Sequence, residues 1–231
     1  MSRVLSHEQA RAFYDAFGAK QDWQRFYEDP AVAILEHQGR FEEARAVVEF
    51  GCGTGRLAER LLRTRLPADA TYLGLDVSPT MIRLGSAKLK PWADRARVQQ
   101  TDGAPTLALP GGACDRLVST YVVDLLADDD IRQLLAEARR VLRPGGRLCL
   151  ASLTFGQGAL ARGICRLWTT IHSLRPQLVG GCRPLALRGY LGSPWTVLHA
   201  ETVCTLGLCT EVVVASPVAL FPRSVTDVQG A

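Results

Sequence analysis

Residues 46–58 read AVVEFGCGTGRLA, and this stretch decides the fold. Its short run of apolar and β-branched residues predicts a strand that is buried on both faces, because such a strand needs no polar alternation. Three glycines at alternate positions follow at once, and a helical pattern begins at Leu57. A strand, a glycine turn and a helix form the geometry in which backbone N–H groups approach a ligand without an intervening Cβ atom.

The spacing of the glycines separates two classes of nucleotide site. A Rossmann dinucleotide site has Gly-x-Gly-x-x-Gly, whereas Glu49, Gly51, Gly53 and Gly55 make the tighter pattern Glu-x-Gly-x-Gly-x-Gly. This pattern resembles motif I of the class I S-adenosylmethionine (SAM)-dependent methyltransferases. A glycine turn can also be only a tight turn, so the next strand should end in an acid that can bind a ribose diol. Residues 70–76, ATYLGLD, end in such an acid, Asp76.

The resemblance implies both a fold and a cofactor. The expected fold class is α/β, with a Rossmann-like seven-stranded sheet, mostly parallel with an antiparallel last strand, and helices on both faces. The expected cofactor is SAM, with S-adenosylhomocysteine as the product. No metal is expected, and no catalytic residue is assigned.

The resemblance also assigns roles around the adenosine. It gives Asp76 to the ribose hydroxyls and Val77 and Met81 to the adenine face, with plain core packing as the alternative for Met81. It gives Asp102 to the adenine amino group and the Gly103 N–H to a ring nitrogen, although Asp-Gly alone is a common turn. The full set assigned to the cofactor is Glu49, Gly51, Cys52, Gly53, Asp76, Val77, Met81, Asp102, Gly103 and Ser119.

Later segments extend the resemblance. Residues 113–121 predict a fourth strand, and the sequence Arg143-Pro144-Gly145-Gly146 separates a helix from the strand at 147–152, a return shared by this class. Residues 197–203 and 208–215 predict two strands joined by a turn too short for a crossover, so they must be antiparallel. Such a terminal hairpin is typical of the methyltransferases, whereas a dinucleotide dehydrogenase would have another βαβ unit.

Size and composition suit one α/β domain with an added lid, since the chain has 231 residues, of which 47% are hydrophobic and 22% charged. It has no run of 18 apolar residues and no hydrophobic segment at its start, so we expect a cytoplasmic protein. Its seven cysteines contain no Cys-x-x-Cys pair. We therefore expect reduced thiols, without a disulfide framework or a structural metal.

We expect five segments along the chain. They are an N-terminal helical cap (1–44), a SAM-binding core (45–155), a helical lid insertion within the same domain (156–194), a terminal β-hairpin (195–216) and a tail (217–231). The cap predicts two short helices and a third that starts at Asp29-Pro30. Its aromatic residues, Tyr14 and Tyr27 among them, either anchor these helices or close over the cofactor.

The insertion is rich in arginine and free of acids. No acidic residue lies between Glu137 and Glu201, and the arginines within the insertion are Arg162, Arg166, Arg175, Arg183 and Arg188. A stripe at helical spacing (Leu160, Ile164, Leu167, Trp168, Ile171 and Leu174) predicts a helix that packs on the domain as core. The arginines allow three interpretations: a solvated basic face, a site for an anionic or lipidic substrate, or contact with an anionic membrane surface.

The expected activity is methyl transfer from SAM to a small-molecule acceptor that is hydrophobic, anionic or lipid-like. Tyr14, Asp124, His172 and His199 are candidates for a general base, but each also has a structural explanation, so none is chosen. A nucleic-acid substrate is disfavoured, because Ser119-Thr120-Tyr121-Val122 lacks the Asn/Asp-Pro-Pro-aromatic motif of amino-methylating enzymes. The alternatives are a SAM-fold binding or scaffold protein without turnover and, less favoured, a nicotinamide-dependent oxidoreductase. The acceptor atom and the oligomeric state stay open.

Overall fold

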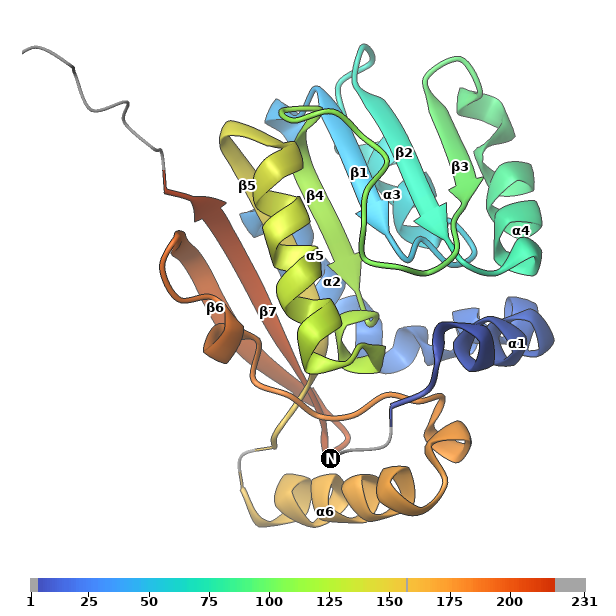
Figure 1. Ribbon diagram of the computed structural model, residues 1–231, viewed down its shortest axis with the longest axis vertical. Coiled ribbons are helices and arrows are strands. Elements are labelled where there is room, and N and C mark those ends of the chain that lie inside the picture. The colour runs from blue at the N-terminus through green and yellow to red at the C-terminus, as the bar shows by residue number, and fades with distance from the viewer. Residues whose placement is uncertain (1–3, 157, 219–231) are drawn as a thin grey trace, which may run out of the picture.

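A seven-stranded sheet organises the chain (Figure 1). The computed structural model describes residues 4–156 and 158–218. The strand order is β3-β2-β1-β4-β5-β7-β6, and β7 alone runs opposite in direction to the other six strands. The strands are β1 (Ala46–Phe50), β2 (Thr71–Asp76), β3 (Ala96–Gln100), β4 (Cys114–Thr120), β5 (Leu142–Thr154), β6 (Trp195–Thr205) and β7 (Leu208–Pro217). This confirms the predicted fold class, including the antiparallel hairpin at the end.

Helices cover both faces of the sheet. In Figure 1 α5 lies in front of the central strands, and α2 and α3 lie behind them. The α-helices are α1 (His7–Phe17), α2 (Arg25–Gln38), α3 (Arg56–Thr64), α4 (Pro79–Leu89), α5 (Asp128–Val141) and α6 (Ala159–Leu174). Short 3-10 helices are η1 (Gly18–Gln24), η2 (Phe41–Glu43), η3 (Lys90–Trp92), η4 (Val123–Leu125), η5 (Pro176–Val179) and η6 (Leu187–Tyr190).

Two hydrophobic clusters, one on each face, hold the layers together. One joins α5 and the segment at 185–191 to the sheet, and the other joins α2 and α3 to the opposite face. β1 contributes to both, which is why its sequence is apolar without alternation. The start of α4 follows its sequence signals, because the Ser78 side chain accepts a hydrogen bond from the Met81 N–H at 3.1 Å and Pro79 occupies the first turn.

One local prediction was wrong and another was right in part. Asp29-Pro30 does not start a third helix, since Pro30 lies inside α2. The run at Arg143–Gly146 does follow the end of α5, as predicted, but it forms the irregular first part of β5, where the register shifts before regular pairing with β4 begins at Arg147. Of the predicted tail, residues 219–231 lie outside the described part of the chain. The division into five segments stays a prediction.

The apolar stripe of the insertion is not all core. On α6, Leu160, Leu167 and Leu174 have exposed fractions of 72%, 63% and 70%. Trp168 does turn inward, where its indole N–H donates to the Cys182 carbonyl oxygen at 2.8 Å. The helix therefore packs by a narrower face than the sequence pattern predicts.

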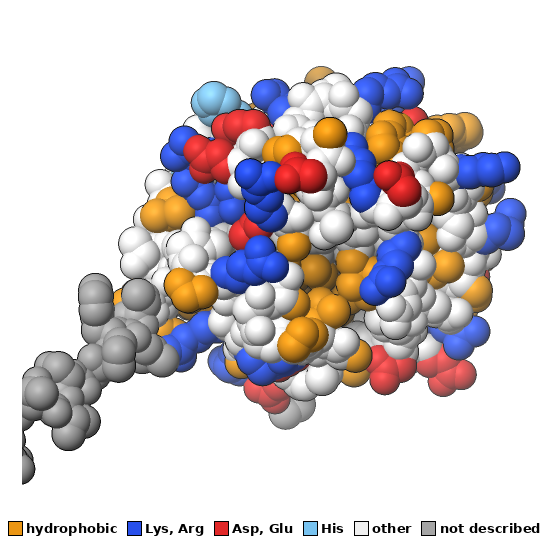
Figure 2. All heavy atoms as spheres, turned by 90° about the horizontal axis from the view of Figure 1, so that it is seen from above, with side chains coloured by type: hydrophobic (Ala, Val, Ile, Leu, Met, Phe, Trp, Pro, Cys, Tyr) orange, Lys and Arg blue, Asp and Glu red, His pale blue; other side chains and the backbone are white. Residues whose placement is uncertain are grey.

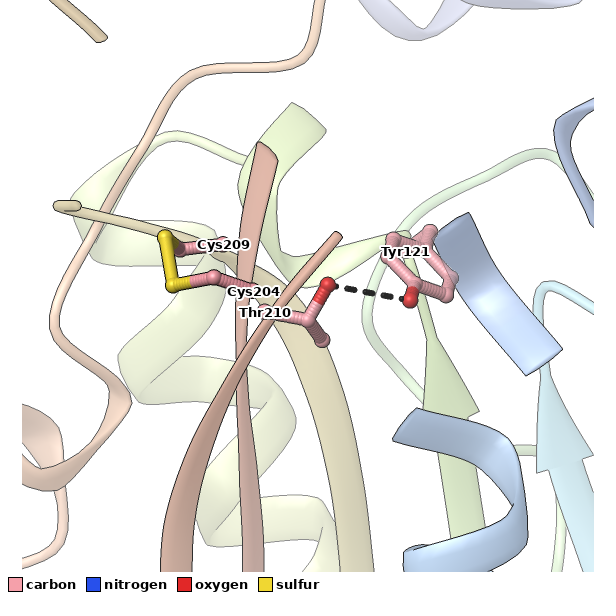
Figure 3. The surroundings of a disulfide bond; sticks show 4 residues. All are labelled: Tyr121, Cys204, Cys209 and Thr210. Carbon is pink, nitrogen blue, oxygen red and sulfur yellow. Dashed lines mark hydrogen bonds between the residues drawn. A yellow bond between two sulfur atoms is a disulfide. The ribbon is translucent and has the colours of Figure 1, made fainter. Parts of the chain in front are cut away.

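The expectation that all cysteines are reduced was also wrong, because Cys204 and Cys209 form a disulfide across the β6–β7 hairpin (Figure 3). The two residues are register partners with Cα atoms 4.0 Å apart. The other five cysteines are free, and all but Cys165 are buried. Among the described residues, no helix combines the length and the apolar character needed to cross a membrane.

The disulfide predicts a simple thiol count. In the unfolded, unreduced protein only five of the cysteines should react with an alkylating reagent, whereas all seven should react after reduction. Because the bridge closes only a short loop, its removal in the Cys204→Ser/Cys209→Ser variant should lower the free energy of unfolding by about 2 kcal/mol in the chain-entropy model. Mass spectrometry and urea unfolding measure these effects. Seven alkylated cysteines without reduction would contradict the bridge, and Cys165→Ser is the matched control.

Candidate functional site

Two adjoining cavities lie between the carboxyl ends of the parallel strands and the N-terminal segment. In Figure 1 α1 passes below the carboxyl ends of β1 and β2. Gly51, Gln21 and Tyr121 line both cavities, so the two share one wall. In open α/β sheets, ligands bind at this edge, outside the carboxyl ends of the strands.

The glycine loop after β1 forms the common floor. Gly51, Gly53 and Gly55 have positive φ values of 79°, 51° and 75°, a region that favours glycine. Close approach adds a second constraint, because a Cβ atom on Gly51 would lie 2.2 Å from Cγ2 of Val122. The N–H groups of Gly51 and Cys52 both donate to the Leu75 carbonyl oxygen, at 2.8 and 2.9 Å, which ties the loop to β2.

The Asp76 carboxylate fixes this loop from the end of β2. One of its oxygens accepts the Gly53 N–H at 2.8 Å, and the other accepts the Ser78 N–H at 2.9 Å. Burial is the largest influence on this carboxyl and raises its pKa, while the backbone N–H donors lower it. Asp76 also lines the larger cavity, so it is available to a ligand as well as to the loop.

The larger cavity is predominantly apolar. Its floor comes from the sheet and from the segment after β4, and its roof comes from α1 and the residues before it. Val77, Met81 and Gly103, which the resemblance assigns to the adenine, line it. The remaining wall residues include Phe50, Leu75, Val122, Leu125, Leu126, Leu5, His7, Ala10 and Tyr14.

The smaller cavity carries charged groups instead. Glu28, Glu49 and Arg56 line it, and the Arg56 guanidinium pairs with Glu28 at 2.7 Å. Burial raises the pKa of Glu28 to about 7 in spite of this arginine. Burial likewise raises the pKa of Glu49 to about 7, although the Tyr72 hydroxyl donates a hydrogen bond to its carboxylate. The cavity thus has groups of both signs within reach of one ligand.

Gln21, on η1, stands at the boundary between the cavities. Its side chain lies over the glycine loop, so that a Cβ atom on Gly53 would be 2.8 Å from the Gln21 Oε1. That oxygen is buried and has no hydrogen-bond partner among the described residues. Buried polar atoms are almost always paired, which marks this oxygen as an acceptor available to a ligand.

Three of the predicted cofactor residues lie differently from the others. Cys52 lines the smaller cavity, but its Sγ packs under Gly74. Asp102 is exposed and accepts the Ala104 N–H at 2.9 Å, outside both cavity walls. Ser119 is buried below the loop, where its hydroxyl donates to the Phe50 carbonyl oxygen at 2.9 Å.

The four candidate bases divide into two groups. Tyr14 lines the larger cavity, and Asp124 is fully buried beside it, where its carboxylate accepts the Leu153 N–H at 3.3 Å. Burial raises the pKa of Asp124 to about 7. His172 is buried against the Gly181 carbonyl oxygen, and His199 lies on β6 beside Glu201. Neither histidine lines the two cavities.

Sequence reasoning did not single out Tyr121 for the site. It directly follows β4 with a positive φ of 56° and donates to or accepts from the Thr210 hydroxyl at 3.1 Å (Figure 3). Its ring packs edge-on against Tyr27 with the centroids 5.7 Å apart. A bulky residue at positive φ is rare and is held only by its surroundings, but the sequence carries no signal for this backbone conformation.

Comparison with known proteins finds a family match over part of the chain. Residues 47–146 match the family described as methyltransferase domain. An uncharacterised methyltransferase of Oceanobacillus iheyensis is 28% identical over 63% of this chain and 68% of its own length. A demethylmenaquinone methyltransferase of Thermus thermophilus is 31% identical over 58% of this chain and 54% of its own length, so the chain spans only part of each relative.

Solved structures share the fold at low sequence identity. The cyclase SpnF superposes with a TM-score of 0.70 at 16% identity, covering 94% of this chain and 99% of that one. The N-methyltransferase NodS of Bradyrhizobium japonicum, in complex with S-adenosyl-L-homocysteine, has a TM-score of 0.63 at 18% identity and covers 82% and 87%. The predicted resemblance to the class I methyltransferases is confirmed.

The buried Glu49 predicts a pH dependence of stability. Because its pKa is about 7 in the folded protein and 4.5 as its ordinary value, folding favours the protonated form. The contribution is therefore fully present below about pH 4.5 and is lost as the pH rises through 7. The unfolding free energy of the wild type should therefore fall between pH 5 and 8. In Glu49→Gln, which keeps an acceptor for Tyr72, this fall should be smaller by about 2 kcal/mol.

Urea unfolding at several pH values measures this difference. The unfolding free energy of the variant should still depend on pH to some extent, because burial also raises the pKa values of Glu28 and Asp124. The exposed Glu42 supplies the matched control, Glu42→Gln. An unchanged slope in Glu49→Gln would contradict the assignment.

Proposed function

We propose that this chain, in which residues 47–146 match the family described as methyltransferase domain, transfers a methyl group from SAM to a small, predominantly apolar acceptor. One observation carries the proposal: an apolar cavity and a charged cavity adjoin across one glycine loop. SAM has the matching composition, a nucleoside joined to a zwitterionic amino acid.

The apolar cavity suits the nucleoside. Asp76 would accept the ribose hydroxyls, with Val77 and Met81 against the adenine and the Gly103 N–H toward a ring nitrogen. Met81 is 1% exposed, so it packs in the core and offers the cavity only a small surface. Asp102 would have to leave its turn with Ala104 to reach the adenine amino group.

The charged cavity suits the amino acid. Glu49 and Glu28 provide carboxylates for the ammonium group, and Arg56 provides a cation for the carboxylate. Gly51, Gly53 and Cys52 bring their backbone close to the same cavity. Ser119 supports the loop through Phe50.

Once bound, the cofactor supplies an activated methyl group. The work of the chain is then to hold an acceptor in line with that group, and such positioning alone can lower a barrier by several kcal/mol. Leu5, Tyr14, Leu125 and Leu126 form the part of the wall away from the glycine loop, and they favour an apolar acceptor. A relative is named for demethylmenaquinone, which supports an acceptor of this class.

One observation favours the alternative of a SAM-fold protein without methyl transfer. SpnF, whose fold covers almost all of this chain, is named a cyclase, so the fold does not by itself establish methyl transfer. The nicotinamide-dependent alternative has less support, because the glycine spacing and the terminal hairpin both differ from a dinucleotide dehydrogenase.

The cofactor assignment predicts the effect of replacing Asp76. Wild-type protein should bind SAM and S-adenosylhomocysteine but not NAD. Asp76→Asn should weaken binding of both adenosyl ligands roughly 10- to 100-fold, since it removes a charge-assisted hydrogen bond to the ribose. Isothermal titration calorimetry measures the affinities, and circular dichroism verifies the fold.

Asp69→Asn is the matched control, because Asp69 lies before the opposite end of β2 and pairs with Arg45 on the surface. Affinity that is equal in Asp76→Asn and the wild type would rule out this site for the ribose. Tight SAM binding without methyl transfer to quinol or isoprenoid acceptors would favour the non-methylating alternative.

A further inference from the structure

The outer side of α6 carries an unpaired row of leucines. Leu160, Leu167 and Leu174 are seven residues apart, which is about two helical turns, so they lie along one line. Leu178, on η5, continues the row and is 70% exposed. We call these four residues the α6 apolar face. Exposed large apolar residues that gather in one place mark an interaction surface more often than scattered ones do.

Arginines on and after α6 also face solvent, and those on α6 lie about a quarter of a turn or more around the helix from the leucines. Arg162 and Arg166 are one turn apart on α6, Arg175 follows the helix, and all three are exposed. Within the described residues, none of the three has a partner at salt-bridge distance. The remaining exposed positions of α6 are uncharged, and no acid occurs between Glu137 and Glu201.

The opposite end of the molecule has a different character. Figure 2 shows that end, where acidic and basic side chains are interspersed. Several arginines there are paired, such as Arg45 with Asp69 and Arg143 with Asp115. The α6 end differs in that its arginines lie in a stretch of sequence without acids.

The α6 apolar face also lies close to the candidate site. Leu174 and Leu178 line a surface groove together with Val4 and Leu5, and Leu5 also lines the larger cavity. Gly207 in the β6–β7 turn packs against Ile164 of α6, which brings the 81% exposed Leu206 to the same end. Figure 1 shows α6 lying crosswise at this end, below the sheet.

We propose that the α6 apolar face docks on an anionic lipid bilayer. The leucines would enter the boundary between headgroups and acyl chains, while Arg162, Arg166 and Arg175 reach the lipid phosphates. Charge complementarity favours this occupant, since the arginine forks match phosphate and none of the three arginines pairs with an acid among the described residues. An apolar acceptor dissolved in the bilayer would then meet the groove beside Leu5.

Co-sedimentation of the full-length protein with vesicles tests this proposal without any need for methyl transfer. The protein should bind vesicles of phosphatidylglycerol and phosphatidylcholine, and it should bind pure phosphatidylcholine vesicles far more weakly. Arg162→Gln/Arg166→Gln should weaken binding roughly 30-fold, because each cation near an anionic surface contributes to binding. Leu160→Asn/Leu167→Asn should weaken it roughly a hundredfold or more.

Arg63→Gln/Arg132→Gln is the charge-matched control, since both arginines are exposed but lie on α3 and α5. It should bind as the wild type does, and thermal melts should show that every variant is folded. The proposal is overturned by wild-type protein that does not bind, by equal binding to neutral vesicles, or by equal losses in the control. It is also overturned if ultracentrifugation shows that the wild type is a dimer, and if Leu160→Asn/Leu167→Asn makes it monomeric without changing vesicle binding.

Discussion

The Asp76 carboxylate joins the elements that form the candidate site. By accepting N–H groups from Gly53 and Ser78, it connects the glycine loop after β1 to the end of β2 and the start of α4. A half-buried acceptor with two backbone donors holds its neighbours in one arrangement, because movement would cost it both hydrogen bonds. The floor of both cavities is therefore set by the sheet, whatever their roof does.

Burial of acids gives the site its electrostatic character. Glu28, Glu49 and Asp124 lie in or beside the cavities, and burial raises the pKa of each to about 7. Keeping a carboxyl out of water costs stability at neutral pH, so a chain selected only for stability would replace these residues with apolar ones. Their presence at one edge of the sheet supports the proposed site, because acids with perturbed pKa values gather at functional sites.

The sequence predicted what depends on local pattern and missed what depends on tertiary contact. Strand β1, the glycine loop and Asp76 follow from apolar runs and glycine spacing, so the fold class and the floor of the site were within reach. The burial of Ser119 beneath the loop and the outward turn of Leu167 are set by packing, which periodicity does not contain. The Cys204–Cys209 bridge depends on the exact hairpin register. The turn at residues 206–207 pairs Thr205 with Leu208 and so Cys204 with Cys209, whereas the predicted three-residue turn at 205–207 would have placed Cys204 opposite Leu208.

Gln21 shows how the roof differs from the floor. The glycine loop has its N–H groups bonded within the fold, whereas the Gln21 Oε1 above it has no partner among the described residues. A ligand that fills both cavities must pass this side chain, and a donor on that ligand would satisfy the oxygen without breaking an existing bond. Binding would then stabilise the position of η1, while the hydrogen bonds of Asp76 would stay unchanged. Recognition in this fold thus divides between a floor built before the ligand arrives and a roof that the ligand completes.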